Sequence, residues 1–145
     1  VHTPGRSRTA WVLNDAVQVD PPGLPPAAEL LATAALFDGL PYLWGGTSGL
    51  GLDCSGLVHL LFRRYGVTVP RDAHDQAAAG PGQIEPTRAA AGDLLFFARP
   101  GQEIHHVGIC AGQGRMLHAP ETGRGVALEP LSPQRQAHLV AARRW

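Results

Sequence analysis

The chain of 145 residues contains no lysine and only two cysteines. It also has no continuous run of about 18 apolar residues, which argues against a membrane-spanning helix. Its 12 basic residues, all arginine, balance 12 acidic residues, so charge does not support a nucleic-acid partner, which would normally need a basic face. The exclusive use of arginine, alongside many Ala, Gly and Pro, indicates a codon-composition bias and not a function.

The two cysteines, Cys54 and Cys110, could form one disulfide, which would suit an exported protein. That pairing would disable either thiol as a nucleophile. The sequence opens at Val1 without a basic and then apolar leader, so an export signal is absent, removed or outside the sequence given. The compartment therefore stays open at this point.

The length and the 44% hydrophobic composition allow one core of ordinary size. Residues 1–20 alternate like short strands, and the proline-rich residues 21–29 have the composition of a stiff linker. One main domain is expected over residues 30–145. Residues 1–20 are either part of a preceding module or an arm packed on this domain.

Hydrophobic spacing predicts two helices followed by several strands. The first helix is expected from Ala27 to Phe37, and the second from Cys54 to Tyr65, before Gly66. Short strands are expected at residues 93–98, 104–111, 115–119 and 139–144. Helices first and antiparallel strands later predict an α+β fold.

The segment Asp53-Cys54-Ser55-Gly56 places a cysteine at the start of the second helix. Unpaired backbone N–H groups and the positive end of a helix stabilise a thiolate there. The alternative is a buried structural thiol, because free cysteine often acts as a small hydrophobic residue. The polar neighbours of Cys54 favour a nucleophile.

Two later strand-like segments each carry a histidine in apolar surroundings, His106 and His118. A thiolate needs an imidazole that takes and returns its proton, and that imidazole needs a partner that fixes its tautomer. Cys54, His106 and His118 can fill these roles. His105 is a competing base, and strand alternation sends it to the face opposite His106.

The chain resembles the NlpC-type, papain-like bacterial cell-wall cysteine peptidases over about residues 30–145. The branch it resembles most is that of the γ-D-glutamyl-L-diamino acid endopeptidases. The resemblance implies a papain-like α+β fold with N-terminal helices packed on an antiparallel sheet, and it selects His106 because the family's histidine directly precedes Val-Gly-Ile. The matching segments are Pro41-Tyr42-Leu43-Trp44-Gly45-Gly46, Asp53-Cys54-Ser55-Gly56-Leu57, Pro70-Arg71-Asp72, Gly92-Asp93-Leu94-Leu95-Phe96-Phe97, His106-Val107-Gly108-Ile109 and His118-Ala119-Pro120.

The resemblance also implies the roles of individual residues. The catalytic residues would be Cys54, His106, His118 and Tyr42, and the substrate-binding residues Trp44, Asp53, Ser55, Arg71 and Asp72. Asp53 would face the free amino end of the substrate, or it would only cap the helix. Arg71 would suit the α-carboxylate of γ-D-glutamate, or it would only form a local ion pair.

The expected function is hydrolysis of murein stem peptides at the γ-D-glutamyl-L-diamino acid bond through a thioester on Cys54. No cofactor and no metal are implied, and residues 1–20 are either the remnant of a preceding SH3-like module in the same chain or an arm packed on this domain. Action in the bacterial cell envelope is favoured, with a cytoplasmic recycling role as the alternative. Competing hypotheses are a non-catalytic murein-binding module and a zinc site at Cys54, His106, Cys110 and His118. The identity of the diamino acid stays open.

Overall fold

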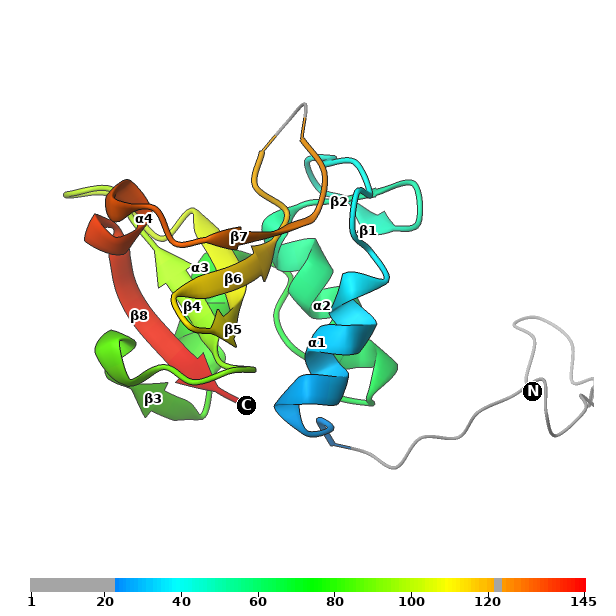
Figure 1. The fold of residues 1–145 in the computed structure, drawn as a ribbon, viewed down its shortest axis with the longest axis horizontal. Coiled ribbons are helices and arrows are strands. Elements are labelled where there is room, and N and C mark those ends of the chain that lie inside the picture. The colour runs from blue at the N-terminus through cyan, green and yellow to red at the C-terminus, as the bar shows by residue number, and fades with distance from the viewer. Residues whose placement is uncertain (1–22, 122–123) are drawn as a thin grey trace, which may run out of the picture.

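In the computed structural model, which describes residues 23–121 and 124–145, helices come first along the chain and most strands follow (Figure 1). The prediction for residues 1–20 lies outside the described residues, as do the first two residues of the expected linker. The helices are α1 (Ala27–Ala35), α2 (Cys54–Arg64), α3 (Ala73–Ala79), the 3-10 turn η2 (Pro86–Arg88) and α4 (Pro133–Ala137).

A six-stranded antiparallel sheet forms the second layer. Its strands are β3 (Gly82–Ile84), β4 (Leu94–Phe97), β5 (His106–Gly112), β6 (Arg115–His118), β7 (Ala127–Pro130) and β8 (Leu139–Arg144). Their order across the sheet is β3-β8-β4-β5-β6-β7, so β8 fills the place between β3 and β4. A separate two-stranded ribbon pairs β1 (Thr47–Ser48) with β2 (Gly51–Leu52). The α+β prediction is confirmed.

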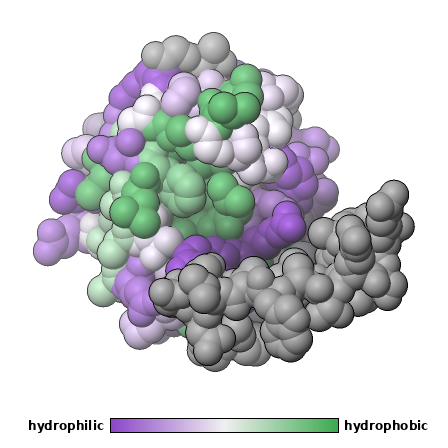
Figure 2. All heavy atoms as spheres, turned by 90° about the vertical axis from the view of Figure 1, so that its right-hand side faces the viewer, coloured by the Kyte–Doolittle hydropathy of each residue, from purple (hydrophilic) through white to green (hydrophobic). Residues whose placement is uncertain are grey.

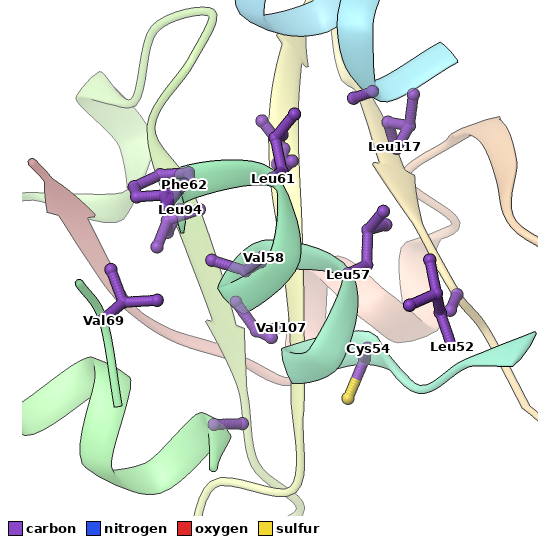
Figure 3. Close-up of a cluster of buried hydrophobic side chains, with 14 of the residues drawn as sticks. Leu52, Cys54, Leu57, Val58, Leu61, Phe62, Val69, Leu94, Val107 and Leu117 are labelled. Atoms are coloured by element: carbon purple, nitrogen blue, oxygen red, sulfur yellow. The ribbon is translucent and has the colours of Figure 1, made fainter. Parts of the chain in front are cut away.

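Residue alternation gives the two faces of the sheet different neighbours. One face packs with α1 and α2, and Figure 3 shows Leu57, Val58 and Leu61 of α2 among residues from the strands. The strand residues that belong to this core are Leu94, Phe96, Val107, Ile109 and Leu117. The alternate positions form a second cluster, which contains Leu95, Phe97, Cys110, Met116 and Ala142. Helices α1 and α2 therefore cover one face of the sheet.

The helix that starts at Cys54 has a clear local cause. Asp53 is its N-cap, and the carboxylate accepts a hydrogen bond of 2.7 Å from the backbone N–H of Gly56. The apolar spacing of the helix turns Leu57, Val58 and Leu61 toward the sheet, where they are fully buried. Capping and burial together fix where this helix begins, and thus where the thiol lies.

The far side of the helical layer carries several apolar side chains. Figure 2 shows them gathered near the centre of the face that lies to the right in Figure 1. Leu36, just after α1, is mostly exposed, and a separate groove is lined by Phe37, Leu60, Leu61, Arg63 and Arg64. Within the described ranges, no helix is long and apolar enough to span a bilayer.

Candidate active site

Cys54 is the first residue of α2, and its side chain lines the main cleft of the molecule although only 7% of the residue is exposed. Figure 3 shows its sulfur pointing away from the labelled apolar side chains of the core. The backbone N–H of Val107 acts on this sulfur, together with the N–H groups of Cys54 and Ser55 at the helix start. Because Val107 follows His106, the start of β5 lies directly against the thiol.

The helix start does not lower the pKa of the thiol by itself, contrary to the expectation from the sequence. Burial raises the pKa of Cys54, and the nearby carboxylate of Asp53 raises it further. The N–H groups of Val107, Ser55 and Cys54 act in the opposite direction but do not outweigh burial. A base must therefore remove the proton as the thiol reacts.

His106 and His118 form the expected pair. Nε2 of His106 lies 2.9 Å from Nδ1 of His118, and the two rings meet edge to face. This contact leaves Nδ1 of His106 available to a reacting thiol. Gly108 makes the arrangement fit, because a Cβ at that position would lie 2.9 Å from Sδ of Met116 and 3.3 Å from Cβ of His118. A side chain there would require Met116 to move and would press against His118.

Both histidines are held in the neutral form. Burial lowers the pKa of His106 well below its usual value, and the proximity of His118 and Arg135 lowers it further. Burial followed by Arg135 lowers the pKa of His118 to about 4, although Glu129 acts in the opposite direction. A neutral imidazole can accept a proton, which the role of general base requires.

These depressed pKa values predict that acid destabilises the fold. An unfolded histidine binds a proton below about pH 6.5, whereas folded His118 does so only near pH 4, so folding stability falls as the pH drops through this window. His118 alone should contribute roughly 3 kcal/mol across the full window. We expect urea unfolding to give a lower free energy of unfolding at pH 4.5 than at pH 7.

The variant His118→Gln should flatten this pH dependence. An exposed histidine, His74, provides the matched control, and His74→Gln should keep the slope of the wild-type protein. An unchanged slope in His118→Gln would contradict the assignment of the acid sensitivity to the buried pair.

The hydrogen-bonded chain continues past His118 to residues that the sequence analysis did not select. Nε2 of His118 lies 3.1 Å from Oε2 of Glu129 on β7, and the other carboxylate oxygen accepts a hydrogen bond from Arg124. Burial opposes ionisation of Glu129, but hydrogen bonds from His118 and Arg124 hold its pKa below the usual value. Glu129 was missed because its strand was not predicted.

Asp53 is the centre of a second polar cluster. Five donors reach its carboxylate: the backbone N–H groups of Gly45 and Gly56, the hydroxyl of Ser55, and both terminal nitrogens of Arg71. Burial opposes its ionisation, but the hydrogen bonds from Arg71 and the two N–H groups lower the pKa of Asp53. These contacts occupy the acceptor capacity of the carboxylate. The capping role is therefore present in the structure.

Arg71 pairs with Asp53 and not with its neighbour Asp72. Its two terminal nitrogens lie 2.9 and 2.6 Å from the two oxygens of Asp53, which is a bidentate pair, and one nitrogen also lies 3.0 Å from the hydroxyl of Ser55. Buried Gln76 of α3 fixes the segment before Arg71, because its amide donates to the carbonyls of Ser55 and Pro70. The guanidinium is thus held beside the first turn of α2.

The remaining predicted site residues line the same cleft. Tyr42 is half-buried, and burial, followed by the proximity of Cys54 and Asp53, raises its pKa, so its hydroxyl stays protonated as a donor. Trp44 is 84% exposed at the rim, which removes the alternative of a core aromatic for this residue. Asp72 lies on the same wall, and His105 lines the cleft as an exposed side chain outside β5.

The size of the cleft favours an extended substrate. Its volume is about 1510 Å³, which exceeds the 300 to 1,000 Å³ that is typical of small-molecule pockets. Cys54 and His106 line it, together with Arg71, which precedes α3, and Arg135 of α4. A short peptide could therefore extend along the cleft on both sides of the thiol.

The alternatives that involve Cys110 are not supported by the geometry. Both cysteines are free thiols, and Cys110 packs in the second apolar cluster, whereas Cys54 belongs to the core under the helices. Within residues 23–121 and 124–145, no group of three or more His, Cys, Asp and Glu side chains is placed to hold a metal ion. The arrangement has the components of nucleophilic catalysis by a thiol.

Known proteins share this arrangement of sequence and fold. The model of the NlpC/P60 family matches residues 39–144. The chain is 47% identical over 121 residues to a γ-D-glutamyl-L-lysine dipeptidyl-peptidase of Bacillus subtilis, covering 81% of this chain and 40% of that protein. It is 38% identical over 113 residues to the murein DD-endopeptidase MepH of Escherichia coli, covering 73% of this chain and 41% of that protein.

A solved structure of an NlpC/P60 family protein from Bacillus cereus superposes with a TM-score of 0.80 at 40% sequence identity. The match covers 83% of this chain and 40% of the solved chain. The chain thus spans about two fifths of the length of these three relatives.

Proposed function

This chain belongs to the NlpC/P60 family, and from that premise we propose that it is a cysteine peptidase of murein stem peptides. The bond cleaved is the γ-D-glutamyl-L-diamino acid bond of peptides that have a free N-terminal L-alanine. The observation that carries the proposal is that His106, at the start of β5 against Cys54 in the cleft, is hydrogen-bonded to His118 at the end of β6. The relative named for dipeptidyl-peptidase activity supports the choice of bond.

The mechanism follows from the groups around the thiol. Nδ1 of His106 takes the proton of Cys54, and the thiolate attacks the carbonyl carbon of the scissile amide. The backbone N–H of Cys54 and the hydroxyl of Tyr42 stabilise the oxyanion. The imidazolium of His106 then protonates the leaving amine, and a thioester remains on Cys54. Finally, His106 removes a proton from water, which attacks the thioester and releases the acid.

The substrate occupies both walls of the cleft in this proposal. Arg71 and Ser55 bind γ-D-glutamate, with Asp72 beside them, and Trp44 covers the peptide at the rim. Asp53 already accepts five hydrogen bonds, so it can receive the amino group of L-alanine only if Arg71 moves from Asp53 to the α-carboxylate of γ-D-glutamate. The α-carboxylate of the bound substrate would then pair with Arg71, and its amino group would pair with Asp53.

The site of action follows from the substrate. Murein lies in the bacterial cell envelope, and the relative from Escherichia coli is named for murein cleavage, so we place the activity there in preference to cytoplasmic recycling. SH3-like modules before this domain would complete the recognition of the substrate's amino end. A catalytically idle murein-binding module of the same fold is the second candidate.

Free and blocked peptides test the proposal directly. We expect the protein to release L-Ala-γ-D-Glu from L-Ala-γ-D-Glu-diaminopimelate, and to act at least about 10-fold more slowly on the N-acetylated peptide, because acetylation removes the cation that Asp53 would bind. Mass spectrometry of the products measures both rates. Lysine in place of diaminopimelate in the same peptide identifies the preferred diamino acid.

The outcomes of this experiment separate the candidate functions. Equal cleavage of the free and acetylated peptides would contradict amino-end recognition and indicate a general murein endopeptidase. Binding of the peptide without any product would favour the non-catalytic module. Transfer of the acyl group to an added amine would show that an acceptor other than water reaches the thioester.

A further inference from the structure

Glu129 has no role in the mechanism above, although it ends the chain of hydrogen bonds that begins at His106. The pairing of β6 with β7 sets Glu129 opposite Met116, two residues from His118 and on the same face. Oε2 lies 3.1 Å from Nε2 of fully buried His118, and Oε1 accepts from Arg124. We propose that Glu129, oriented by Arg124, is a positioning residue that sets the protonated nitrogen of both site histidines.

The carboxylate of Glu129 determines where the protons of both histidine rings lie. An ionised carboxylate only accepts hydrogen bonds, so Nε2 of His118 must carry the proton that it donates to Glu129. Nδ1 of neutral His118 is then a bare acceptor, which obliges Nε2 of His106 to donate to it over 2.9 Å. Nδ1 of His106 is consequently unprotonated. Nδ1 of His106, which is not hydrogen-bonded to His118, can thus accept the proton of Cys54.

The opposite tautomers, with the proton on Nδ1 of both rings, would prevent His106 from acting as the base. If a donor faced Nε2 of His118, the proton of that ring would move to Nδ1, and His106 would have to accept at Nε2. His106 would then carry its own proton on Nδ1 and could not take one from the thiol. A carboxylate at position 129 excludes this state, and Arg124 helps to keep that carboxylate ionised.

The other charged groups near the pair do not select a tautomer. Arg135 of α4 acts on both His106 and His118, and His105 acts on His106, but each contributes only a positive charge that disfavours protonation. Arg124 also disfavours a charge on His118, while Glu129 favours it. Among the described residues, Glu129 is the acceptor that faces Nε2 of His118.

Glu129→Gln is the most discriminating test, because Arg124 would determine the orientation of the new amide group. Arg124 donates to the oxygen that His118 does not contact, so it would hold the carbonyl of the new amide and turn the NH₂ group toward His118. Nε2 of His118 would then have to accept from this amide, so both rings would carry their proton on Nδ1 and His106 could not act as the base. We expect kcat/KM for the murein peptide to fall by about 100-fold or more.

Removal of Arg124 should rescue this variant. In Glu129→Gln/Arg124→Ala the amide can rotate and accept from His118, so at least about 10-fold of the lost kcat/KM should return. Arg124→Ala alone should cost less than about three-fold, because this arginine is half-exposed and its ion pair is screened. Glu85→Gln, an exposed carboxylate outside the cleft, should leave kcat/KM unchanged. Additive losses in the double variant would overturn the proposal, because a purely structural role predicts them.

This inference rests on the proposed function, but nitrogen NMR tests it without turnover. In Cys54→Ala protein with ¹⁵N-labelled histidine, both rings should appear as Nε2–H tautomers, with His118→Asn used to assign the signals. Adding Glu129→Gln should convert them to Nδ1–H tautomers and lower the pKa of His118, because the carboxylate is lost. Nδ1–H tautomers in the protein that retains Glu129 would refute the proposal, whereas loss of peptide cleavage alone would count only against the peptidase assignment.

Discussion

Replacement of Cys54 by alanine is expected to lower kcat/KM for the murein peptide by at least about 10⁴-fold while the protein stays folded. The variant removes the proposed nucleophile, and Cys110, the other cysteine, cannot replace it because it lies in a different apolar cluster. The change in volume is small, so the free energy of unfolding should fall by only about 1 kcal/mol. Peptide cleavage and urea unfolding measure the two effects.

Cys110→Ala is the matched control for this experiment. Cys110 is as buried as Cys54, but it packs with Leu95 and Met116 and does not line the cleft. Its replacement should affect stability to a similar degree and leave kcat/KM within about three-fold of the original value. Retention of more than a hundredth of the activity in Cys54→Ala would show that the nucleophile is another group.

Gly56→Ala should be among the most destabilising single substitutions in the protein, although alanine is the better helix former. Intrinsic helix propensity favours alanine over glycine by about 1 kcal/mol. Against this, a Cβ on Gly56 would lie only 2.0 Å from the carbonyl oxygen of Gly46 and 2.9 Å from Oδ1 of Asp53. Because that oxygen belongs to the backbone, relief requires α2 and the 45–46 turn to separate. We expect a net loss of about 3 kcal/mol or more.

Activity should fall with stability in Gly56→Ala, because the same displacement moves the N–H groups and the thiol at the helix start. Gly49→Ala is the control, since Gly49 has open space around its Cβ position and lies outside the left-handed region. Chemical denaturation should give the wild-type free energy of unfolding for this control. A Gly56→Ala protein within about 1 kcal/mol of the original would mean that the close approach to Gly46 is easily relaxed.

Much of the fold could be predicted because its main elements carry strong local signals. The second helix has a cap at Asp53, a continuous apolar face and a glycine at its end, and the structure confirms it from Cys54 to Arg64. The expected strands at 93–98, 104–111, 115–119 and 139–144 correspond to β4, β5, β6 and β8. In contrast, β3 and β7 are short segments whose pairing with β8 and β6 defines them. Such elements depend on tertiary contacts and leave little local pattern.

The residues of the candidate site also divide into those that the sequence pattern identifies and those that depend on tertiary contacts. Cys54 is identifiable because it lies at a helix start, and His106 because it lies in an apolar strand and directly precedes Val-Gly-Ile, as the family's histidine does. Glu129 is not, since alternation in Ala127–Pro130 resembles an ordinary solvent-facing edge until β7 is paired with β6. The bond between Arg71 and Asp53 joins residues 18 positions apart, and the sequence offered the adjacent Asp72 as a simpler partner.

The position of β8 in the sheet also determines at what point during synthesis the sheet can be completed. Residues 139–144 join β3 to β4, and Arg144 holds buried Asp93 through two hydrogen bonds of 2.8 Å. A chain that emerges from the ribosome carries its thiol and both histidines before this strand is synthesised. We therefore expect the sheet, and with it the arrangement of the candidate site, to be completed only after synthesis has passed residue 144.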